Sequence, residues 1–301
     1  MNKIILCCML VLLLLTVSCV NKAPLGSKKN PIKMYFVPSM EANKVVTSGE
    51  AIADFLEQET GYFFKVAVPT SYAAVIEAMG TKEADIAWLA TYAYILAHDK
   101  YGAEVRLSTV RNGLDKYRGQ FVARADSKIN SIEDIEGKVI AFTDAASTSG
   151  FIYPSAVLQE REIKPKDYFF AGGHPQAILA VYSKRADIAC TYWSPPDQDD
   201  VPQDARLKLI ETYPDVLEKI AIVGYTDWIP NDTVTIRKDF PQDIEDRIIT
   251  ALVEYVATSE GRQVMKDLYD IDGLNKATDA DYNIVRQTLK TLGKDPTDFL
   301  K

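Results

Sequence analysis

Short apolar runs alternate with longer stretches of helical periodicity along most of this chain. The first half contains strand-like runs at Lys33–Val37, Phe63–Val68 and Ala84–Leu89. Between and after them, apolar residues recur at helical spacing over Thr47–Glu59, Ser71–Met79 and Thr91–His98. This alternation predicts an α/β protein built from open sheets with flanking helices. Thr47 with Glu50 three positions later predicts an N-terminal capping box for the first helix.

The same pattern restarts after two further strands, Arg106–Val110 and Gly119–Arg124. Strands are expected at Lys138–Phe142, Tyr168–Ala171 and Ala186–Cys190, with helices between them. The segment Ala-Asp-Ile-Ala occurs in both halves, at 84–87 and 186–189, each time after a helix. We therefore expect two similar lobes with a ligand cleft between them, at the carboxyl ends of the strands.

The rest of the chain is expected to return to the first lobe. Strands are predicted at Ala221–Tyr225 and Thr233–Arg237, and the C-terminal part, Gln242–Leu292, reads as helical with no new strand. The first lobe then comprises 32–122 plus 226–301, and the second comprises 123–225.

The N-terminus has the features of an export signal. Lys3 precedes an apolar run that is shorter than a typical membrane span, and Cys19 follows this run. Residues 1–19 resemble a bacterial lipoprotein signal in which Cys19 is lipidated, although Thr16 stands where Leu is usual; a plain secreted protein is the alternative. Residues 20–31 are polar and contain Pro and Gly, which predicts a flexible tether.

The net charge and the counts of cysteine and histidine argue against several classes of function. The net charge of −8 argues against nucleic acid as a partner. With the signal removed and Cys19 modified, Cys190 alone remains, so no intrachain disulfide is expected, and a buried structural thiol is favoured. The two histidines cannot form a multi-histidine metal site, and we expect no metal and no cofactor.

The strongest chemical signal is the run Ser147-Thr148-Ser149-Gly150 between a strand and a helix. Free N–H groups and the dipole at a helix start favour an anion, and three hydroxyls add neutral donors. Gly150 lets a ligand approach the backbone. The alternative is an ordinary N-cap. Three hydroxyls in succession favour a site for a tetrahedral oxyanion.

This run, Pro154, Gly172-Gly173-His174 and Ala186-Asp187 together resemble the phosphate/phosphite/phosphonate-binding proteins of bacterial ABC importers. Pro69–Val75, Lys116–Gly119 and Ile229–Asp232 extend the resemblance to nearly the whole chain from 32 to 300. It implies a two-lobed periplasmic-binding-protein-like fold of type II. It also implies a monomer that delivers a small phosphorus-containing anion to an ABC permease.

The resemblance also implies site residues. Ser147, Thr148, Ser149 and His174 would hold the phosphonate oxygens, and the first lobe would add hydroxyls, placed at Thr70, Tyr72 and Tyr92. Asp232 matches a position that binds a ligand amine. The chain departs from the family at Tyr192-Trp193, where aromatic faces suit a methylated ammonium. The alternative is that Trp193 packs its own loop and that neither it nor Asp197 touches ligand.

Other function classes have weaker support. Ser149 and His174 could suggest a nucleophile and base, but the chain has no Gly-x-Ser-x-Gly elbow, P-loop or dinucleotide glycine pattern. We therefore expect no enzymatic activity. A ligand sensor for a membrane signalling protein, or a receptor for a non-phosphonate solute, would use the same clamp, and the sequence does not separate transport from sensing. Nor does it identify the particular oxyanion or the number of membranes.

Overall fold

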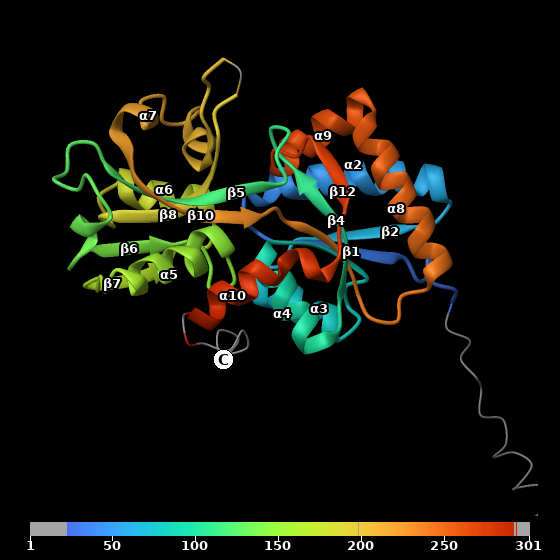
Figure 1. Cartoon of the computed structure of the whole chain (residues 1–301). Coiled ribbons are helices and arrows are strands. Elements are labelled where there is room, and N and C mark those ends of the chain that lie inside the picture. The colour runs from blue at the N-terminus through green and yellow to red at the C-terminus, as the bar shows by residue number, and fades with distance from the viewer. Residues whose placement is uncertain (1–22, 198, 292, 294–301) are drawn as a thin grey trace, which may run out of the picture.

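The computed structural model describes residues 23–197, 199–291 and 293, and it has two sheets lying side by side, each flanked by helices (Figure 1). This is the α/β, two-lobed architecture expected from the sequence. The expected signal segment and Cys19 lie outside the described residues. Within the described part of the chain, no helix combines the length and apolar character needed to cross a bilayer.

The first sheet has the strand order β12-β4-β11-β3-β1-β2. Its strands are β1 (Ile32–Phe36), β2 (Phe64–Ala67), β3 (Ile86–Leu89), β4 (Glu104–Val110), β11 (Thr233–Ile236) and β12 (Gly273–Lys276). Strand β1 runs parallel to β2 and β3, and β11 returns antiparallel to β3. Its helices are α2 (Ala42–Thr60), α3 (Tyr72–Gly80), α4 (Thr91–Tyr101), α8 (Gln242–Ala257), α9 (Ser259–Tyr269) and α10 (Asn283–Thr291).

The second sheet has the order β10-β5-β8-β6-β7, with the short β9 (Gln203–Asp204) paired to β8. Its strands are β5 (Lys116–Arg124), β6 (Val139–Phe142), β7 (Asp167–Phe170), β8 (Ile188–Ser194) and β10 (Ile220–Pro230). Here β6 runs parallel to β7 and β8, as β1 does to its neighbours in the first sheet. Its helices are α5 (Tyr153–Glu160), α6 (His174–Tyr182) and α7 (Val216–Lys219). Cys190 lies buried in β8, as expected, and burial raises the pKa of its thiol.

The chain crosses between the sheets twice, from β4 into β5 and from β10 into β11. The expected lobe boundaries, 122/123 and 225/226, fall inside β5 and β10, which pair with each other along the second sheet. Asn231 joins the two crossings, because its side-chain amide donates to the carbonyls of Thr109 (2.9 Å) and Leu114 (2.8 Å). These segments are therefore bonded to each other where the lobes meet.

Two expected elements differ from the structure. The first helix begins at Ala42 with Glu41 as N-cap, so the capping box at Thr47 was wrong. Val45 lies on the same buried face as Ile52 and Leu56, which extends the apolar stripe before the exposed Thr47. The prediction of no strand after residue 242 was also wrong. Strand β12 pairs with β4 at the sheet edge, and Leu274 is its one buried residue, so its sequence carries little alternation.

The described part of the expected tether is folded onto the first lobe. Ser27 and Asn30 form a β-bridge, and the Asn30 side chain donates to the carbonyl of Ala23 (2.9 Å). The Phe63 amide donates to the carbonyl of Gly26 (2.8 Å), and Leu25 packs against the core. Residues 23–31 therefore belong to the folded lobe rather than to a flexible leash, since their backbone groups find partners there.

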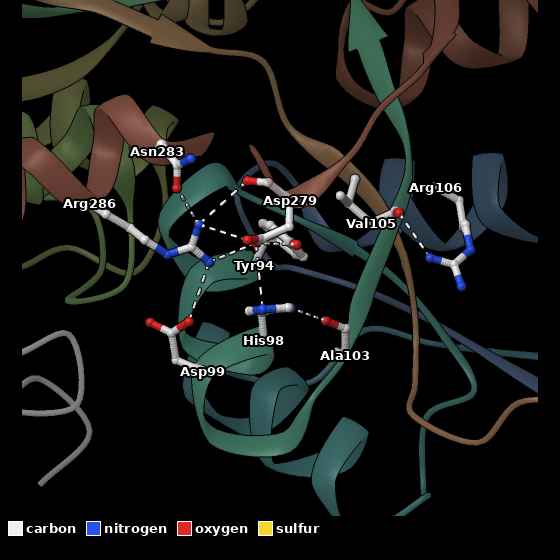
Figure 2. A network of polar contacts seen from close by, with 9 residues as sticks. All are labelled: Tyr94, His98, Asp99, Ala103, Val105, Arg106, Asp279, Asn283 and Arg286. Carbon is white, nitrogen blue, oxygen red and sulfur yellow. Dashed lines mark hydrogen bonds and ion pairs between the residues drawn. The ribbon is translucent and has the colours of Figure 1, made fainter. Parts of the chain in front are cut away.

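Helix α10 is fastened to the first lobe by a polar network and also packs against α5 of the second lobe (Figure 2). Arg286 forms ion pairs with Asp279 (2.6 Å) and Asp99 (3.3 Å), and the Tyr94 hydroxyl donates to Asp279 (2.8 Å). His98 Nδ1 lies 2.8 Å from the carbonyl oxygen of Ala103. This network fixes the C-terminal helix beside α4, close to the boundary between the lobes.

Candidate functional site

A cavity of about 30 Å³ lies between the lobes. Loops and strand ends of both sheets contribute to it. It is lined by Val37, Ser39, Met40, Tyr72, Ala90, Arg111, Tyr117, Ser147, Ser149, His174, Tyr192, Asp232 and Tyr269. A single buried water requires roughly 10–15 Å³. The cavity therefore suits a compact ligand only somewhat larger than water.

The lining residues follow the symmetry of the two sheets. Ser39 follows β1 and Ser147 follows the equivalent strand β6. Tyr72 follows β2 and His174 follows β7, each at the first position of its helix. These positions are the carboxyl ends of parallel strands, where open α/β sheets bind ligands. The same backbone plan thus directs unlike side chains from the two lobes into one cavity.

The turn at Ser147–Gly150 acts both as a helix cap and as part of the cavity wall. The Ser147 hydroxyl accepts the Gly150 amide at 3.1 Å, and Ser147 and Ser149 line the cavity. The helix opens with a π-turn over Thr148–Ile152 before α5 continues it. A Cβ on Gly150 would lie 2.2 Å from Thr143 Oγ1, so close packing requires glycine there.

Direct bonds beside the cavity join the two lobes. Thr148 Oγ1 accepts the backbone amide of Tyr92 at 2.8 Å, and the His174 amide donates to the carbonyl of Ser39 at 3.1 Å. Lys208 and Asp270 form an ion pair at 2.8 Å between the lobes. Thr148 therefore serves the contact between lobes, and it is not among the residues that line the cavity.

His174 is buried at the start of α6, and its ring packs edge-on against Tyr192 with a centroid distance of 4.9 Å. Burial, assisted by the nearby Arg111 charge, lowers the pKa of His174 to about 3. The imidazole is therefore neutral at neutral pH. It can offer one N–H to a ligand without adding a charge.

Four tyrosines also line the cavity: Tyr72, Tyr117, Tyr192 and Tyr269. Burial, as the largest cause, raises the pKa of all four phenols, so each keeps its proton. The Tyr269 hydroxyl donates to the carbonyl of Val37 (2.6 Å), and the Tyr192 hydroxyl lies 3.4 Å from the Asp270 carboxylate. The cavity is thus surrounded by neutral hydroxyl groups.

One ion pair also reaches the cavity. Arg111 Nη2 donates to Asp232 Oδ2 at 2.7 Å, and Arg111 Nε donates to the carbonyl of Tyr269 at 2.8 Å. Burial by itself would lower the pKa of Arg111, but the Asp232 carboxylate raises it above its usual value. The guanidinium therefore stays charged, and with its carboxylate partner it adds no net charge to the cavity.

The structure brings five of the expected ligand-binding residues to the cavity: Ser147, Ser149, His174, Tyr72 and Asp232. Thr70 is exposed outside it, and Tyr92 contributes a backbone amide to Thr148 rather than a lining side chain. Trp193 also lies outside the lining. Its ring packs on Tyr225 at 4.8 Å, as in the alternative in which it packs its own surroundings.

Sequence reasoning missed Ser39, Arg111, Tyr117 and Tyr269 as site residues, and it considered Tyr192 only as an aromatic face for a methylated ammonium. The rule that ligands bind at carboxyl ends of strands could have found Ser39, which lies shortly after β1. Arg111 likewise follows β4, but a basic residue in a turn has no distinctive pattern. Within the described residues, no group of three or more His, Cys, Asp or Glu side chains is placed to hold a metal ion.

Comparison with known proteins identifies the family of this chain. The sequence profile of periplasmic substrate-binding proteins of phosphonate ABC transporters matches residues 34–282. The "Phosphate-import protein PhnD" of Mycolicibacterium smegmatis is 29% identical over 175 residues, which is 54% of each chain. The "Phosphonates-binding periplasmic protein" of Escherichia coli is 27% identical over 221 residues, 71% of this chain and 62% of that protein. The matched parts thus span little more than half of these curated relatives.

Solved structures agree at the level of the fold. A binding protein component of an ABC phosphonate transporter from Pseudomonas aeruginosa superposes with a TM-score of 0.77 at 23% identity, covering 89% of this chain and 87% of that one. PhnD1 from Prochlorococcus marinus, in complex with methylphosphonate, gives 0.75 at 15% identity, covering 88% and 98%. With the two-sheet topology and the interlobe cavity, the match over residues 34–282 shows that this chain belongs to the family of periplasmic substrate-binding proteins of phosphonate ABC transporters.

Proposed function

We propose that this protein is an exported receptor that captures a phosphonate or a related small phosphorus oxyanion and delivers it to an ABC permease. The observation that carries the proposal is a cavity lined by neutral polar groups, with serines from both lobes, four phenols and an uncharged imidazole. Desolvated neutral donors bind an oxyanion strongly because a bound oxygen replaces water at each of them. Closure of the two lobes would surround the ligand.

The properties of these lining groups suit ligand binding rather than catalysis. A general base needs a pKa near the working pH, whereas burial holds the pKa of His174 at about 3. The Ser147 hydroxyl accepts the Gly150 amide as a cap, and this leaves its own proton available for a ligand oxygen. In this proposal the protein acts as a monomer with no cofactor, no metal and no nucleic acid partner.

The test is isothermal titration of the purified protein with phosphate, phosphite, methylphosphonate, 2-aminoethylphosphonate, phosphocholine and sulfate. We expect saturable binding of at least one phosphorus compound and a raised melting temperature in its presence. A Ser149→Ala protein should bind that compound about tenfold more weakly, since one neutral hydrogen bond is lost. Failure of every phosphorus compound to bind would overturn the proposal.

Delivery and anchoring need separate measurements. We propose that Cys19 carries a lipid that holds the receptor at the membrane, facing the periplasm or the cell exterior. Mass spectrometry of the membrane-extracted protein should find an acylated Cys19, and a Cys19→Ser protein should appear in the soluble fraction. Cells that lack the receptor should lose uptake of the compound identified by titration, and the intact gene should restore uptake.

A further inference from the structure

The Arg111–Asp232 pair lies at the two crossings between the lobes. Arg111 directly follows β4 and Asp232 directly precedes β11, and the Thr109 amide donates to the carbonyl of Asp232 at 2.9 Å. The Arg111 guanidinium is also held by the carbonyl of Tyr269 and lies over the Tyr117 ring, 5.7 Å from its centroid. Both the backbone and the counterion therefore fix the Asp232 carboxylate in the wall of the cavity.

One oxygen of this carboxylate is unsatisfied. Oδ2 accepts from Arg111, whereas Oδ1 is buried and has no hydrogen-bond partner among the described residues. A buried carboxylate oxygen without a donor is costly, and native proteins seldom leave one unpaired. The other polar side chains of the lining are hydroxyls, an imidazole and a guanidinium, which suit the oxygens of an anion. Asp232 Oδ1 is therefore available to accept a hydrogen bond from a ligand in the cavity.

An ammonium group and a hydroxyl group are the two candidate donors. Arg111 already neutralises Asp232, and a second cation at Oδ1 would lie close to the guanidinium, where a low dielectric strengthens repulsion. A cavity of about 30 Å³ also leaves little room for an aminoalkyl tail. Both observations favour a hydroxyl on the phosphorus atom.

We propose that Asp232 accepts a hydrogen bond from a P–OH group, so that the cavity selects tetrahedral phosphorus acids in a protonated form. This inference rests on the proposed function and specifies the ligand of the same site. Phosphate and monoprotonated methylphosphonate satisfy Asp232. Sulfate and phosphonate esters carry no hydroxyl at neutral pH and leave the carboxylate facing an oxygen lone pair.

The first test uses the unmodified protein and size-matched ligands. At about pH 6, sulfate should bind at least ten- to a hundredfold more weakly than phosphate, the loss expected for an unpaired buried group. The second pair is the monomethyl ester of methylphosphonate and ethylphosphonate, which have the same number of heavy atoms. Ethylphosphonate retains a P–OH group, so the ester should bind more weakly than ethylphosphonate by a similar factor. Equal affinities within either pair would overturn the inference.

The second test uses pH. Between about pH 6 and about pH 9, methylphosphonate loses its last proton whereas phosphate keeps one, so methylphosphonate affinity should fall about tenfold or more and phosphate affinity should change little. Phosphate is the control for titration of the protein. The groups that face Asp232 or share its cavity are Arg111, Tyr72, Tyr117, Tyr192, Tyr269, Tyr282 and His174.

None of these groups changes charge across that range, because the pKa of Arg111 and of each phenol is raised and that of His174 is lowered to about 3. Tighter binding of methylphosphonate at the higher pH would mean that the cavity prefers the dianion. That result would overturn the inference.

The third test is Asp232→Asn, with Asp227→Asn as the control because Asp227 is exposed and lies outside the cavity lining. The ratio of phosphate to sulfate affinity should fall about tenfold or more in Asp232→Asn and stay unchanged in Asp227→Asn. A purely structural role for Asp232 would weaken both anions equally. If Asp232→Asn does not fold, the ester and pH tests decide. If phosphorus acids bind but their esters and sulfate bind as well, this inference fails while the proposed function stands.

Discussion

The segment Ala-Asp-Ile-Ala occupies equivalent places in the two lobes, and its aspartate makes the same backbone contact in both. Asp85 accepts the amide of Lys33 in β1, and Asp187 accepts the amide of Val139 at the start of β6, each at 2.9 Å. The environments differ. Asp85 is buried and paired with Arg237 at 2.7 Å, whereas Asp187 is exposed. The motif thus contacts equivalent strands, β1 and β6, in the two sheets, and the surroundings of each aspartate decide how much stability it contributes.

The same contrast extends to the cavity. The two lobes share a backbone plan and both contribute serines and tyrosines, but the charged pair Arg111–Asp232 comes from the first lobe and His174 from the second. Internal symmetry therefore predicts the architecture of the two sheets, but it does not predict which side chains each lobe contributes to the cavity. Variants made in matched pairs separate these two aspects.

The largest expected difference is between Asp85→Ala and Asp187→Ala. Removing Asp85 leaves the nearly buried Arg237 without its counterion. Breaking such a pair costs about 3–5 kcal/mol of unfolding free energy. Removing the exposed Asp187 costs about 1 kcal/mol, the value of one hydrogen bond. Denaturant unfolding measures both, and equal losses would show that the backbone contact, rather than the ion pair, dominates.

The buried His174 should link the stability of the protein to pH. The pKa of His174 falls from 6.5 to about 3 on folding, so below its unfolded pKa the unfolded chain binds a proton that the native state refuses. Its contribution to stability is therefore complete above about pH 6.5 and is lost at about 1.4 kcal/mol per pH unit down to about pH 3. Unfolding at several pH values should show a shallower slope in His174→Gln. His98→Gln is the control, and an unchanged slope in His174→Gln would contradict the assignment.

Two serine caps offer a smaller contrast. Ser71 accepts the Ala74 amide at 3.2 Å, and Ser147 accepts the Gly150 amide at 3.1 Å. Either change to alanine should therefore cost about 1 kcal/mol of stability. Ser147 also lines the cavity, whereas Ser71 does not. Calorimetry should show an additional loss of oxyanion affinity, about tenfold, in Ser147→Ala alone. A similar loss in Ser71→Ala would mean that cap geometry, and not the hydroxyl, controls binding.

The smallest effect is expected at Trp193, next to Tyr192 on β8. Neighbouring residues of a strand point to opposite faces, and Tyr192 lines the cavity while Trp193 packs beside Tyr225. Trp193→Ala should change the affinity for every ligand tested by less than about twofold. Tyr192→Phe should weaken binding several-fold, because it removes a hydroxyl from the cavity lining together with the contact of that hydroxyl to Asp270. A selective loss of phosphocholine binding in Trp193→Ala would support an aromatic cage for methylated amines instead.

The sequence predicted the parts of the fold that depend on local patterning. Apolar runs located β1, β3, β6 and β8, and the repeated Ala-Asp-Ile-Ala indicated two similar lobes. It predicted less where tertiary contacts overrule local preference. The start of α2 depends on the burial of Val45, and β12 exists because β4 offers an edge to pair with.

For the cavity, hydroxyls at a strand-to-helix turn were a readable signal, and Ser147 and Ser149 lie where that signal placed them. Arg111 and Tyr269 lie far apart in the sequence, and a hydrogen bond joins them in the cavity wall. No local pattern marks such residues, because their position depends on how the first lobe is reassembled from both ends of the chain. Trp193 illustrates the reverse case, in which a suggestive residue faces away from the cavity.

Two hydrogen bonds between the lobes affect how the binding affinity can change. One joins Thr148 to Tyr92, and the other joins His174 to Ser39. They connect lobe to lobe without passing through a ligand, so in a protein whose lobes open and close they would favour the closed form. A binding constant measured for any solute contains the balance between open and closed molecules as a common factor. Substitutions at Thr148 would therefore tune affinity for all solutes in proportion. Substitutions at Asp232 would change their ranking, so strength and choice of cargo can be adjusted independently.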